Sequence, residues 1–310
     1  MKIVTSIQAA SRIRRKVFLS IGNFDSCHRV HAEILKWTAG EARRTGGEAW
    51  ALTFSNHPLM VLKGRRPALL STTKEKLELL GKTGLTGVLL IRFTKAFSRL
   101  SGQEFIGRLC GLMNIHTVCV GDNFLFGSSN KGDTFLLDRS GREYGFRLKT
   151  FPVRRDGRSG AVVSSSAIRV FLAKGRIAEA NRFLGRPYSV AATVVRGRQL
   201  GRKLGFPTLN FDPGELARSS KLLPKDGVYA TETSLSGGSE RLIRGLTYVG
   251  PKFGTARMTV ETHLLDFSGN AYGRTATVRF LKFIRGPRTF RSAEALRAGI
   301  RNDINISRRL

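Results

Sequence analysis

The sequence is poor in cysteine and in long apolar runs. Its three cysteines, Cys27, Cys110 and Cys119, have no CxxC spacing and are odd in number, which favours free thiols in a reducing compartment. No stretch approaches the roughly 20 apolar residues of a membrane span. No apolar segment follows the basic residues near the start, so the pattern does not predict secretion. We therefore expect a cytoplasmic protein without membrane segments.

Acidic residues are also scarce, since 22 Asp and Glu face 53 Lys and Arg, for a formal net charge of +31. Such a charge suggests nucleic acid first. The excess is spread evenly, however, with 31 basic against 13 acidic residues over 1–185 and 22 against 9 over 186–310. There is no basic tail and no RNP or zinc-finger motif. Uniform drift towards arginine explains the charge at least as well, so we expect no nucleic-acid partner. The sequence does not define an oligomeric state.

What the sequence does contain is enough apolar material for two cores: 310 residues, of which 41% are hydrophobic. The character of the chain changes near Gly185. Strands and helices alternate before this point, and short β runs separated by glycine and proline turns follow it. The sequence therefore predicts two domains, residues 1–185 and 186–310.

In the first half, apolar runs of strand length alternate with helical segments. We expect strands at Val17–Ser20, Ala49–Phe54, 87–93 and Thr117–Val120, a strand pair ending at Val153, and helices over 32–37, 71–84, 101–113 and most of 161–185, the last beginning with strand residues. This alternation predicts an α/β layer with a parallel sheet. In such sheets ligands bind beyond the carboxyl ends of the strands, which is where His28, His57 and Asn123 fall.

The stretch VFLSIGNFDSCHRVH, residues 17–31, is the first candidate site. A strand turns over Gly22 towards a helix start, which leaves backbone N–H groups able to bind an anion. His28 and His31 lie one helical turn apart and can donate hydrogen bonds to phosphate oxygens. A buried strand followed by an ordinary surface helix would give the same pattern.

A second candidate lies at the start of the helix after residue 161. Ser164 or Ser165 can cap this helix, and Arg169 falls within its first turns. Hydroxyls and an arginine at a helix start form a possible phosphate clamp. An ordinary serine cap with a solvated arginine fits as well.

The second half reads as an antiparallel barrel. Its β runs cover 189–195, 227–235, 241–249, 258–267 and 275–284, and an amphipathic helix over 292–310 should pack against them. Within GRKLGFPTLNF, Thr208 and Asn210 offer oxygens to a hard cation such as Mg²⁺. Glu261 lies on a strand among apolar residues, where a carboxylate is costly unless it has a partner or a function.

These segments resemble, in order and over about Val17 to Ile306, the bacterial bifunctional riboflavin kinase/FAD synthetase family. GNFDSCHRVH is similar to the family's GxFDGVHxGH, TFSNHPLMVL to TFxPHPxxVL, and GDNFLFG with KGD to GxDFxFGxxxxGD. VSSSAIRVFLAKGRIAEANRFLGRPY is similar to VSSTxIRxxLxxGxxxxAxxLLGRPY, GRKLGFPTLNF to GRxLGFPTANL, and ETHLLDFSGNAYG to EVHLLDFxGDLYG. Agreement of so many motifs in register is far more specific than any single motif.

The resemblance implies a Rossmann-like α/β nucleotidyltransferase domain with a parallel sheet, followed by a small antiparallel β-barrel riboflavin kinase domain with a C-terminal helix. It also implies two reactions. The barrel transfers the γ-phosphoryl group of ATP to riboflavin, which gives FMN. The first domain couples FMN with ATP, which gives FAD and pyrophosphate. Both steps use Mg²⁺ in this family.

By the same resemblance, roles can be assigned to individual residues. Glu261 is implied as the base for the ribityl hydroxyl, and Thr208 and Asn210 as holding the metal and the phosphates. His28, His31 and Arg169 are implied as donors during adenylyl transfer. The remaining implied contacts are with ATP or phosphate, through Gly22, Phe24, Asp25, Ser164, Ser165, Gly201, Arg202, Gly205 and Pro207, and with the flavin, through Asn123, Phe124 and Phe126.

The sequence departs from the family at several positions. Ser26, Cys27 and Val30 replace Gly, Val and Gly in the first loop, and VGPKFGT is a shortened form of a family loop in the barrel. Glycine lets the backbone approach a phosphate, and a β-branched residue crowds it. Two explanations stand: the chain is a riboflavin kinase whose adenylyltransferase has degenerated, or both halves have drifted while the reacting side chains remain. We favour the intact two-step enzyme.

Overall fold

The computed structural model describes residues 1–64, 67–237, 241–251 and 258–309, and residues 252–255 of VGPKFGT lie outside it. The described chain forms two compact units, Met1–Ser165 and Ser166–Leu310. The structural boundary therefore falls after the first residue of helix α7 (Ser165–Ala173) and before α8 (Ile177–Leu184). The functional boundary after residue 185 is a separate matter and stays a prediction.

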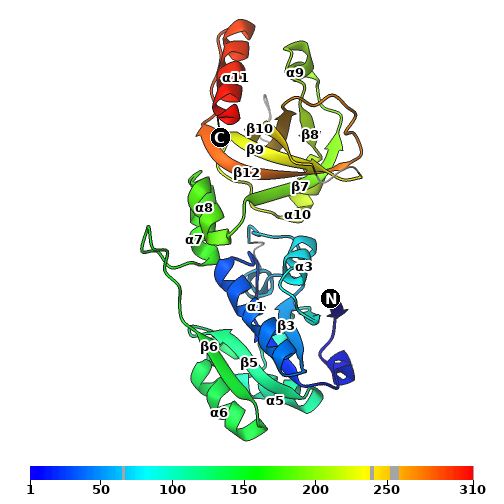
Figure 1. The fold of residues 1–310 in the computed structure, drawn as a ribbon, viewed down its shortest axis with the longest axis vertical. Helices are drawn as coiled ribbons and strands as arrows, with labels where there is room; N and C mark the ends of the chain where they lie inside the picture. Colours follow the sequence, from blue (N-terminus) through cyan, green and yellow to red (C-terminus); the bar gives the residue numbers. More distant parts are fainter. Residues whose placement is uncertain (65–66, 238–240, 252–257, 310) are drawn as a thin grey trace. The chain divides into compact units, whose positions relative to one another are not determined.

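The first unit is built on a six-stranded parallel sheet with the strand order β1-β4-β3-β2-β5-β6 (Figure 1). Its strands are β1 (Lys2–Val4), β2 (Val17–Ile21), β3 (Glu48–Phe54), β4 (Gly87–Ile91), β5 (Ile115–Gly121) and β6 (Arg147–Phe151). The central strands are buried on both faces, as their continuous apolar runs require. The predicted parallel α/β layer is confirmed. The order reverses between β2 and β5, which places the switch point of the sheet there.

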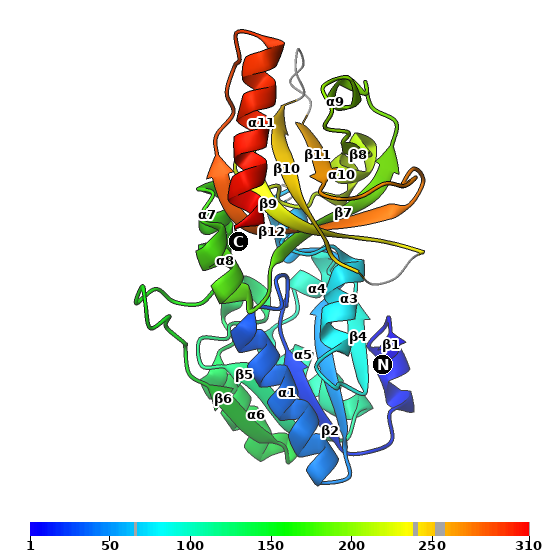
Figure 2. The same cartoon turned by 45° about the horizontal axis from the view of Figure 1, so that its top comes forward.

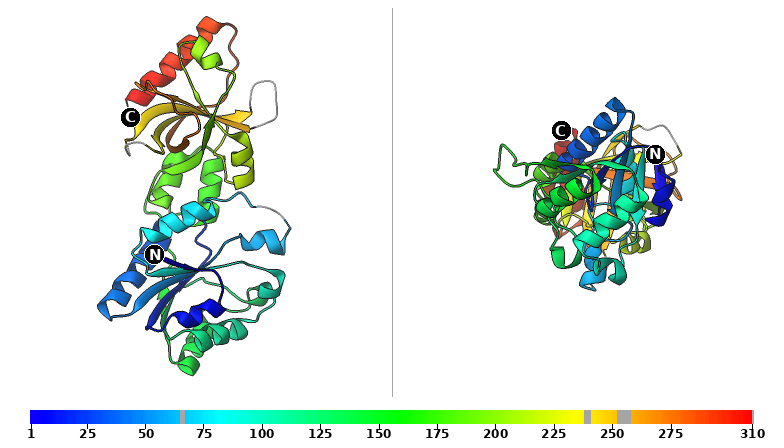
Figure 3. Two further views of the ribbon diagram at one scale, coloured as in Figure 1. Left: turned by 90° about the vertical axis from the view of Figure 1, so that its right-hand side faces the viewer. Right: turned by 90° about the horizontal axis from the view of Figure 1, so that it is seen from below.

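Helices cover both faces of this sheet. On one face α1 (Arg29–Arg44) and α3 (Thr73–Gly81) pack over a core that includes Phe18 and Leu35. On the other face lie η1 (Gln8–Arg12), α5 (Gly102–Leu112) and α6 (Thr134–Tyr144) (Figure 3, left). Short elements α2 (Pro58–Leu62), α4 (Lys95–Ser98) and η2 (Ser128–Asn130) sit in the loops. The predicted start of α3 is confirmed, because Thr72 and Glu75 form a complete capping box.

Two sequence-based expectations were wrong in detail, and one strand was missed. The strand pair ending at Val153 is a helix, α6, followed by the single strand β6, because the chain stays helical to Tyr144 and ends at the left-handed Gly145. The segment 161–164 forms no strand, and its helical part is two helices separated at Gly175, whose φ is +73°. The short edge strand β1 was not anticipated.

The second unit is a closed antiparallel barrel with the strand order β10-β11-β8-β7-β12-β9 (Figure 2). Its strands are β7 (Tyr188–Val195), β8 (Leu209–Phe211), β9 (Gly227–Leu235), β10 (Ile243–Pro251), β11 (Met258–Leu264) and β12 (Thr275–Arg285). The predicted barrel is confirmed, and the additional strand is β8. The helices α9 (Leu200–Lys203) and α10 (Pro213–Ser219) lie in its loops.

The C-terminal helix α11 (Ala293–Arg308) packs against β9 and β10, as predicted. A buried ion pair attaches it to the barrel, because Arg285 on β12 approaches Asp303 at 2.7 Å with both side chains largely buried. The same guanidinium donates through its Nε as well, so the pair is bidentate. Within the described residues, no helix is both long and apolar enough to cross a membrane.

Candidate active sites

The first site forms where β2 ends and α1 begins, at the switch point of the parallel sheet. His28 is the N-cap of α1, and its Nδ1 accepts the backbone N–H of His31 at 3.3 Å. The two imidazole rings stack at a centroid distance of 3.7 Å. Because Nδ1 of His28 is an acceptor, its proton lies on Nε2, which can donate. The structure therefore brings the two predicted histidines together. One backbone N–H group at the helix start, that of His31, is hydrogen-bonded to His28.

Burial lowers the affinity of His31 for a proton. His28 is 5% exposed. Burial, and to a smaller extent the charge of the neighbouring His28, holds the pKa of His31 well below its usual value. His31 is thus neutral at physiological pH and can donate from one ring nitrogen only. Its Nδ1 is buried without a hydrogen-bond partner among the described residues, as is Oδ1 of Asn23 in the same loop. Buried polar atoms of this kind are expected where a ligand completes the site.

The loop before α1 is held by its own polar groups. The carboxylate of Asp25 is buried and accepts the backbone N–H of Leu70 at 3.3 Å, and the Ser71 hydroxyl donates to the carbonyl of Asp25. Gly22 donates its N–H to Leu52 on β3 at 3.1 Å. Asp25 therefore supports the loop from within.

The departures from the family motif are accommodated in this loop. The left-handed residues are Phe24 (φ +48°) and Cys27 (φ +40°), whereas Ser26 has an ordinary φ. The hydroxyl of Ser26 is fully buried and forms a hydrogen bond with the hydroxyl of Ser165 at 3.0 Å. Val30 lies inside the first turn of α1, where the backbone does not require glycine. The conformation of the loop therefore needs no glycine at position 26 or 30.

The loop after β5 lies on the other side of the switch point. Asn123 is exposed and Phe124 is half-buried, whereas Phe126 is 7% exposed and belongs to the core. The rings of Phe124 and Phe126 stack at 5.5 Å. Phe126 therefore supports Phe124 from below, and the accessible aromatic surface of this loop is that of Phe124.

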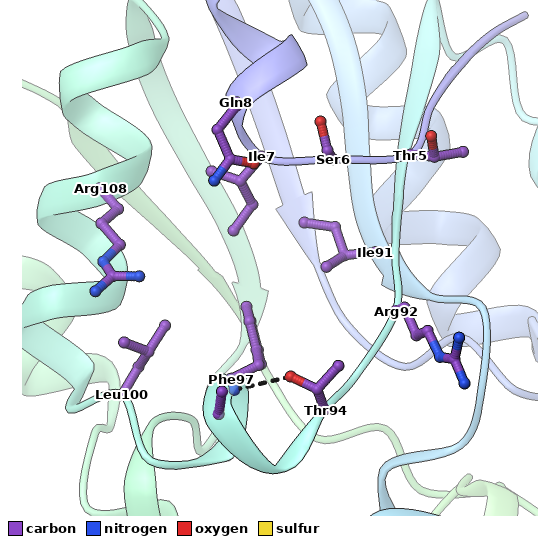
Figure 4. Close-up of a pocket in the computed structure, with 11 residues that line it drawn as sticks. Thr5, Ser6, Ile7, Gln8, Ile91, Arg92, Thr94, Phe97, Leu100 and Arg108 are labelled. Atoms are coloured by element: carbon purple, nitrogen blue, oxygen red, sulfur yellow. Dashed lines mark hydrogen bonds between the residues drawn. The ribbon is translucent and has the colours of Figure 1, made fainter.

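A hollow of about 410 Å³ opens beyond the carboxyl ends of β1 and β4 (Figure 4). Apolar side chains, among them Ile91, Phe97 and Leu100, line part of it, and Arg92 and Arg108 stand at its sides. None of the predicted site residues lines it. Ring contacts from Phe97 to Phe105 and from Phe105 to Phe126 connect it to the loop after β5.

The second predicted clamp lies at the start of α7. Ser164 precedes α7 and Ser165 is its first residue, while Arg169 is half-buried and lies four residues after Ser165. Residues four apart share one face of a helix. Ser165 and Arg169 therefore lie on the same face of α7.

The barrel carries the other site. Glu261 on β11 and Asn210 on β8 are directly opposed in the antiparallel register. Opposed residues point to the same face with their Cβ atoms about 5 Å apart. The side-chain amide of Asn210 also donates to the carbonyl of Thr208 at 3.3 Å. The structure thus brings Thr208, Asn210 and Glu261 together, and Glu261 is half-buried on the outer face of the barrel, not among its interior apolar residues.

The loop before β8 is compact. Gly201 accepts the N–H of Phe206 at 2.8 Å, and a Cβ on Gly201 would lie 2.3 Å from the Phe206 carbonyl oxygen. Gly205 has a φ of +87°, which favours glycine. Arg202 and Pro207 are exposed in the same loop. Gly201 is therefore explained by the lack of space for a side chain, and Gly205 by its backbone conformation. Arg202 is exposed to solvent in this loop.

Sequence reasoning missed three side chains around these sites. His263 on β11 bonds the carbonyl of Pro207 at 2.8 Å and so fastens the loop beside Glu261. Tyr248 on β10 is the register partner of Glu261, and burial, then the negative charges of Asp226 and Glu261, raise its pKa. Lys76 is buried beneath the first loop. Its position one turn before the buried Leu80 on α3 was the available signal, because a lysine on an apolar stripe is unusual.

Two features are typical of a two-unit transferase that uses nucleotides. One is the loop with two histidines at the switch point of a parallel sheet, and the other is the oxygen-rich cluster on a separate barrel. Comparison with known proteins agrees: the FAD synthetase family matches residues 10–167, and the riboflavin kinase family matches residues 184–310. The chain belongs to the bifunctional riboflavin kinase/FMN adenylyltransferase family.

Two relatives illustrate the similarity. The bifunctional riboflavin kinase/FMN adenylyltransferase of Escherichia coli (strain K12) is 34% identical over 308 residues, which cover 98% of this chain and 96% of that protein. The protein of the same name from Pseudomonas fluorescens is 32% identical over 313 residues, covering 100% and 98%. A crystal structure described as a macrolide-efflux protein from Streptococcus pneumoniae has the same fold over the full length of both chains, with a TM-score of 0.87 and 24% identity.

Proposed function

We propose that this chain converts riboflavin to FMN and then FMN to FAD, with one reaction in each functional domain, 186–310 and 1–185. The observation that supports the proposal is that two clusters of side chains suited to phosphate chemistry occur in one polypeptide. One is the stacked pair His28 and His31 at the switch point of the sheet, and the other is Thr208, Asn210 and Glu261 on the barrel.

In the barrel, the 5′-hydroxyl oxygen of riboflavin attacks the γ-phosphorus of ATP, and ADP leaves. Glu261 accepts the hydroxyl proton, a role that its half-buried carboxylate beside Asn210 supports. The loop with Gly201, Gly205 and Pro207 holds the nucleotide by its backbone, and Arg202 supplies positive charge. Tyr248, next to Glu261 on the neighbouring strand, borders the carboxylate.

The oxygen ligands around Asn210 suit Mg²⁺ only when the phosphates of ATP supply further ligands. No group of three His, Cys, Asp or Glu side chains suited to a metal occurs in the part of the chain that is described. Thr208 and Asn210 instead offer neutral oxygens, and Mg²⁺ is commonly bound by few protein oxygens together with substrate phosphates. We propose that these two residues hold the ion. When bound, Mg²⁺ neutralises charge on the transferred phosphoryl group.

In the α/β unit, a phosphate oxygen of FMN attacks the α-phosphorus of ATP, and pyrophosphate leaves. The nucleophile is already an anion, so the site needs donors for a crowded, highly charged transition state rather than a strong base. His28 and His31 are those donors, and His31, although neutral, retains one ring N–H that can donate. Ser164, Ser165 and Arg169 contact the pyrophosphate, which the common face of Ser165 and Arg169 on α7 supports. Gly22, Phe24 and Asp25 shape the loop around the phosphates.

The flavin ring is proposed to stack on Phe124, with Asn123 at its polar edge and Phe126 as the support below. A cytoplasmic location is consistent with the three free thiols, Cys27, Cys110 and Cys119.

Supplying FMN or riboflavin separately, each with ATP and Mg²⁺, tests the two halves independently when the flavins are resolved by chromatography. FAD from FMN supports the first domain, and FMN from riboflavin supports the barrel. FMN formation without any FAD formation would indicate a kinase with a degenerate adenylyltransferase. Formation of neither product would favour a non-catalytic flavin- or nucleic-acid-binding protein on the same scaffold.

A further inference from the structure

Lys76 on α3 is a buried lysine that neither proposed reaction uses. Lys76 is 6% exposed. Its ammonium donates hydrogen bonds to two backbone carbonyls, that of Asn23 at 3.1 Å and that of Phe54 at 2.9 Å. A lysine is almost never buried unless it is paired. Here the charge joins the end of β3 to the loop that follows β2.

The Asn23 carbonyl is one of the points at which this loop is fixed. It accepts a second hydrogen bond, from the hydroxyl of Thr53 at 2.9 Å. The next residue, Phe24, has a left-handed backbone at φ +48°, which a non-glycine residue adopts only when its surroundings impose it. The two donors to Asn23 supply that constraint.

Phe24 transmits the constraint to the histidines. Its ring is 3% exposed and meets the ring of His31 edge-on at a centroid distance of 5.2 Å. His31 in turn stacks on His28. A continuous set of contacts therefore runs from the Lys76 ammonium through the Asn23–Phe24 peptide to both imidazoles.

We propose that Lys76 is a positioning residue for adenylyl transfer, which holds the Asn23–Phe24 backbone and, through the Phe24 ring, the orientation of His31 towards the phosphates. This inference rests on the proposed function of the α/β unit. The nearby charged and titratable groups are Asp25 and Cys27, which favour the ammonium, whereas burial opposes it and lowers the pKa of Lys76 to about 8. The lysine thus stays cationic at neutral pH and loses its charge in mildly alkaline solution.

Full-length Lys76→Met, which keeps the length of the side chain without its charge, is compared with Lys74→Met, an exposed lysine on the same helix. The kcat for FAD formation from FMN should fall by about 10- to 100-fold in Lys76→Met, with a much smaller change in KM for ATP. FMN formation from riboflavin in the same samples should match that of Lys74→Met. Lys76→Arg should recover part of the rate, and it should remove the decline in FAD formation that we expect of the wild type above about pH 8.

A double-mutant cycle with His31→Gln tests the route. If Lys76 acts through His31, the double variant should be little slower than His31→Gln alone. An unchanged rate of FAD formation in Lys76→Met would overturn the inference, and so would equal losses in both reactions or fully additive effects with His31→Gln. Wild-type protein that forms no FAD would instead refute the proposed function, so the two failures are distinguishable.

Discussion

Glu261 and Asn210 face each other across the antiparallel ladder between β11 and β8, on the outer surface of the barrel. This register places a carboxylate beside an amide that also contacts Thr208. A shift of one residue would turn Glu261 to the opposite face. The pairing therefore depends on β8, a strand of only three residues, and on the loop that His263 fastens to β11.

Replacing the proposed base tests this arrangement. Glu261→Gln keeps the shape of the side chain but cannot accept the proton of the ribityl hydroxyl, so FMN formation should fall by about 10²- to 10⁴-fold. FAD formation from supplied FMN should be unchanged. Asp266→Asn, an exposed carboxylate on the same segment that pairs with Arg308, is the control. Normal FMN synthesis by Glu261→Gln, measured by chromatography, would show that the base is another group.

The converse result is expected in the α/β unit. His31→Ala should abolish FAD formation from FMN, because a donor to the transition state is lost, while riboflavin phosphorylation continues. His116→Gln is a suitable control, since His116 lies near the start of β5, at the opposite end of the strands from the site. Retained FAD formation in His31→Ala would remove the histidine from the mechanism.

The buried state of His31 also predicts a dependence of stability on pH. The folded pKa lies below the unfolded value of about 6.5, so the unfolded chain takes up the proton first as pH falls. Stability from this group is complete above pH 6.5 and is lost as pH falls towards the folded pKa. The midpoint temperature of thermal unfolding should fall more between pH 7 and pH 5 in the wild type than in His31→Gln. Equal decreases would mean that His31 titrates normally.

The hydroxyl pair of Ser26 and Ser165 predicts how the loop tolerates its departure from the family motif. Ser26→Gly removes a buried hydrogen bond and adds backbone freedom, so it should reduce stability by about 1–2 kcal/mol. FAD formation should stay within about threefold of wild type, because φ at this position does not require glycine. Unfolding by urea and the FAD assay measure the two effects. A large gain in FAD formation would show that Ser26 impairs the site.

Much of the fold followed from the sequence because the local signals were consistent. The capping box of α3, the buried apolar runs of β2 and β4, and the alternation in the barrel each predicted one structure. The helix α6 was missed because its last residue, Tyr144, is followed by Gly145 and then by β6, and an aromatic residue beside a glycine also suits the turn of a strand pair. The strands β1 and β8 have only three residues each and carry little pattern.

The sequence predicted which residues make up the two candidate sites, but it did not predict the contacts that hold them. Motif spacing indicated His28, His31, Thr208, Asn210 and Glu261, whereas several of the hydrogen bonds that fix the loops around them join residues far apart in the sequence. The bond from Lys76 to Asn23 spans 53 residues, and that from His263 to Pro207 spans 56. Such partners are set by tertiary packing and leave only a weak local signal, such as a lysine on an apolar helical stripe.

The order of the two reactions is tested most directly with labelled ATP. Riboflavin and Mg²⁺ are incubated with the full-length protein and ATP labelled at either the γ- or the α-phosphorus, and the flavins are separated over time. The γ-label should enter FMN first and FAD later, because the FMN phosphate is retained, and the α-label should enter FAD alone. Absence of the α-label from every flavin, with γ-label in FMN, would contradict the two-step account.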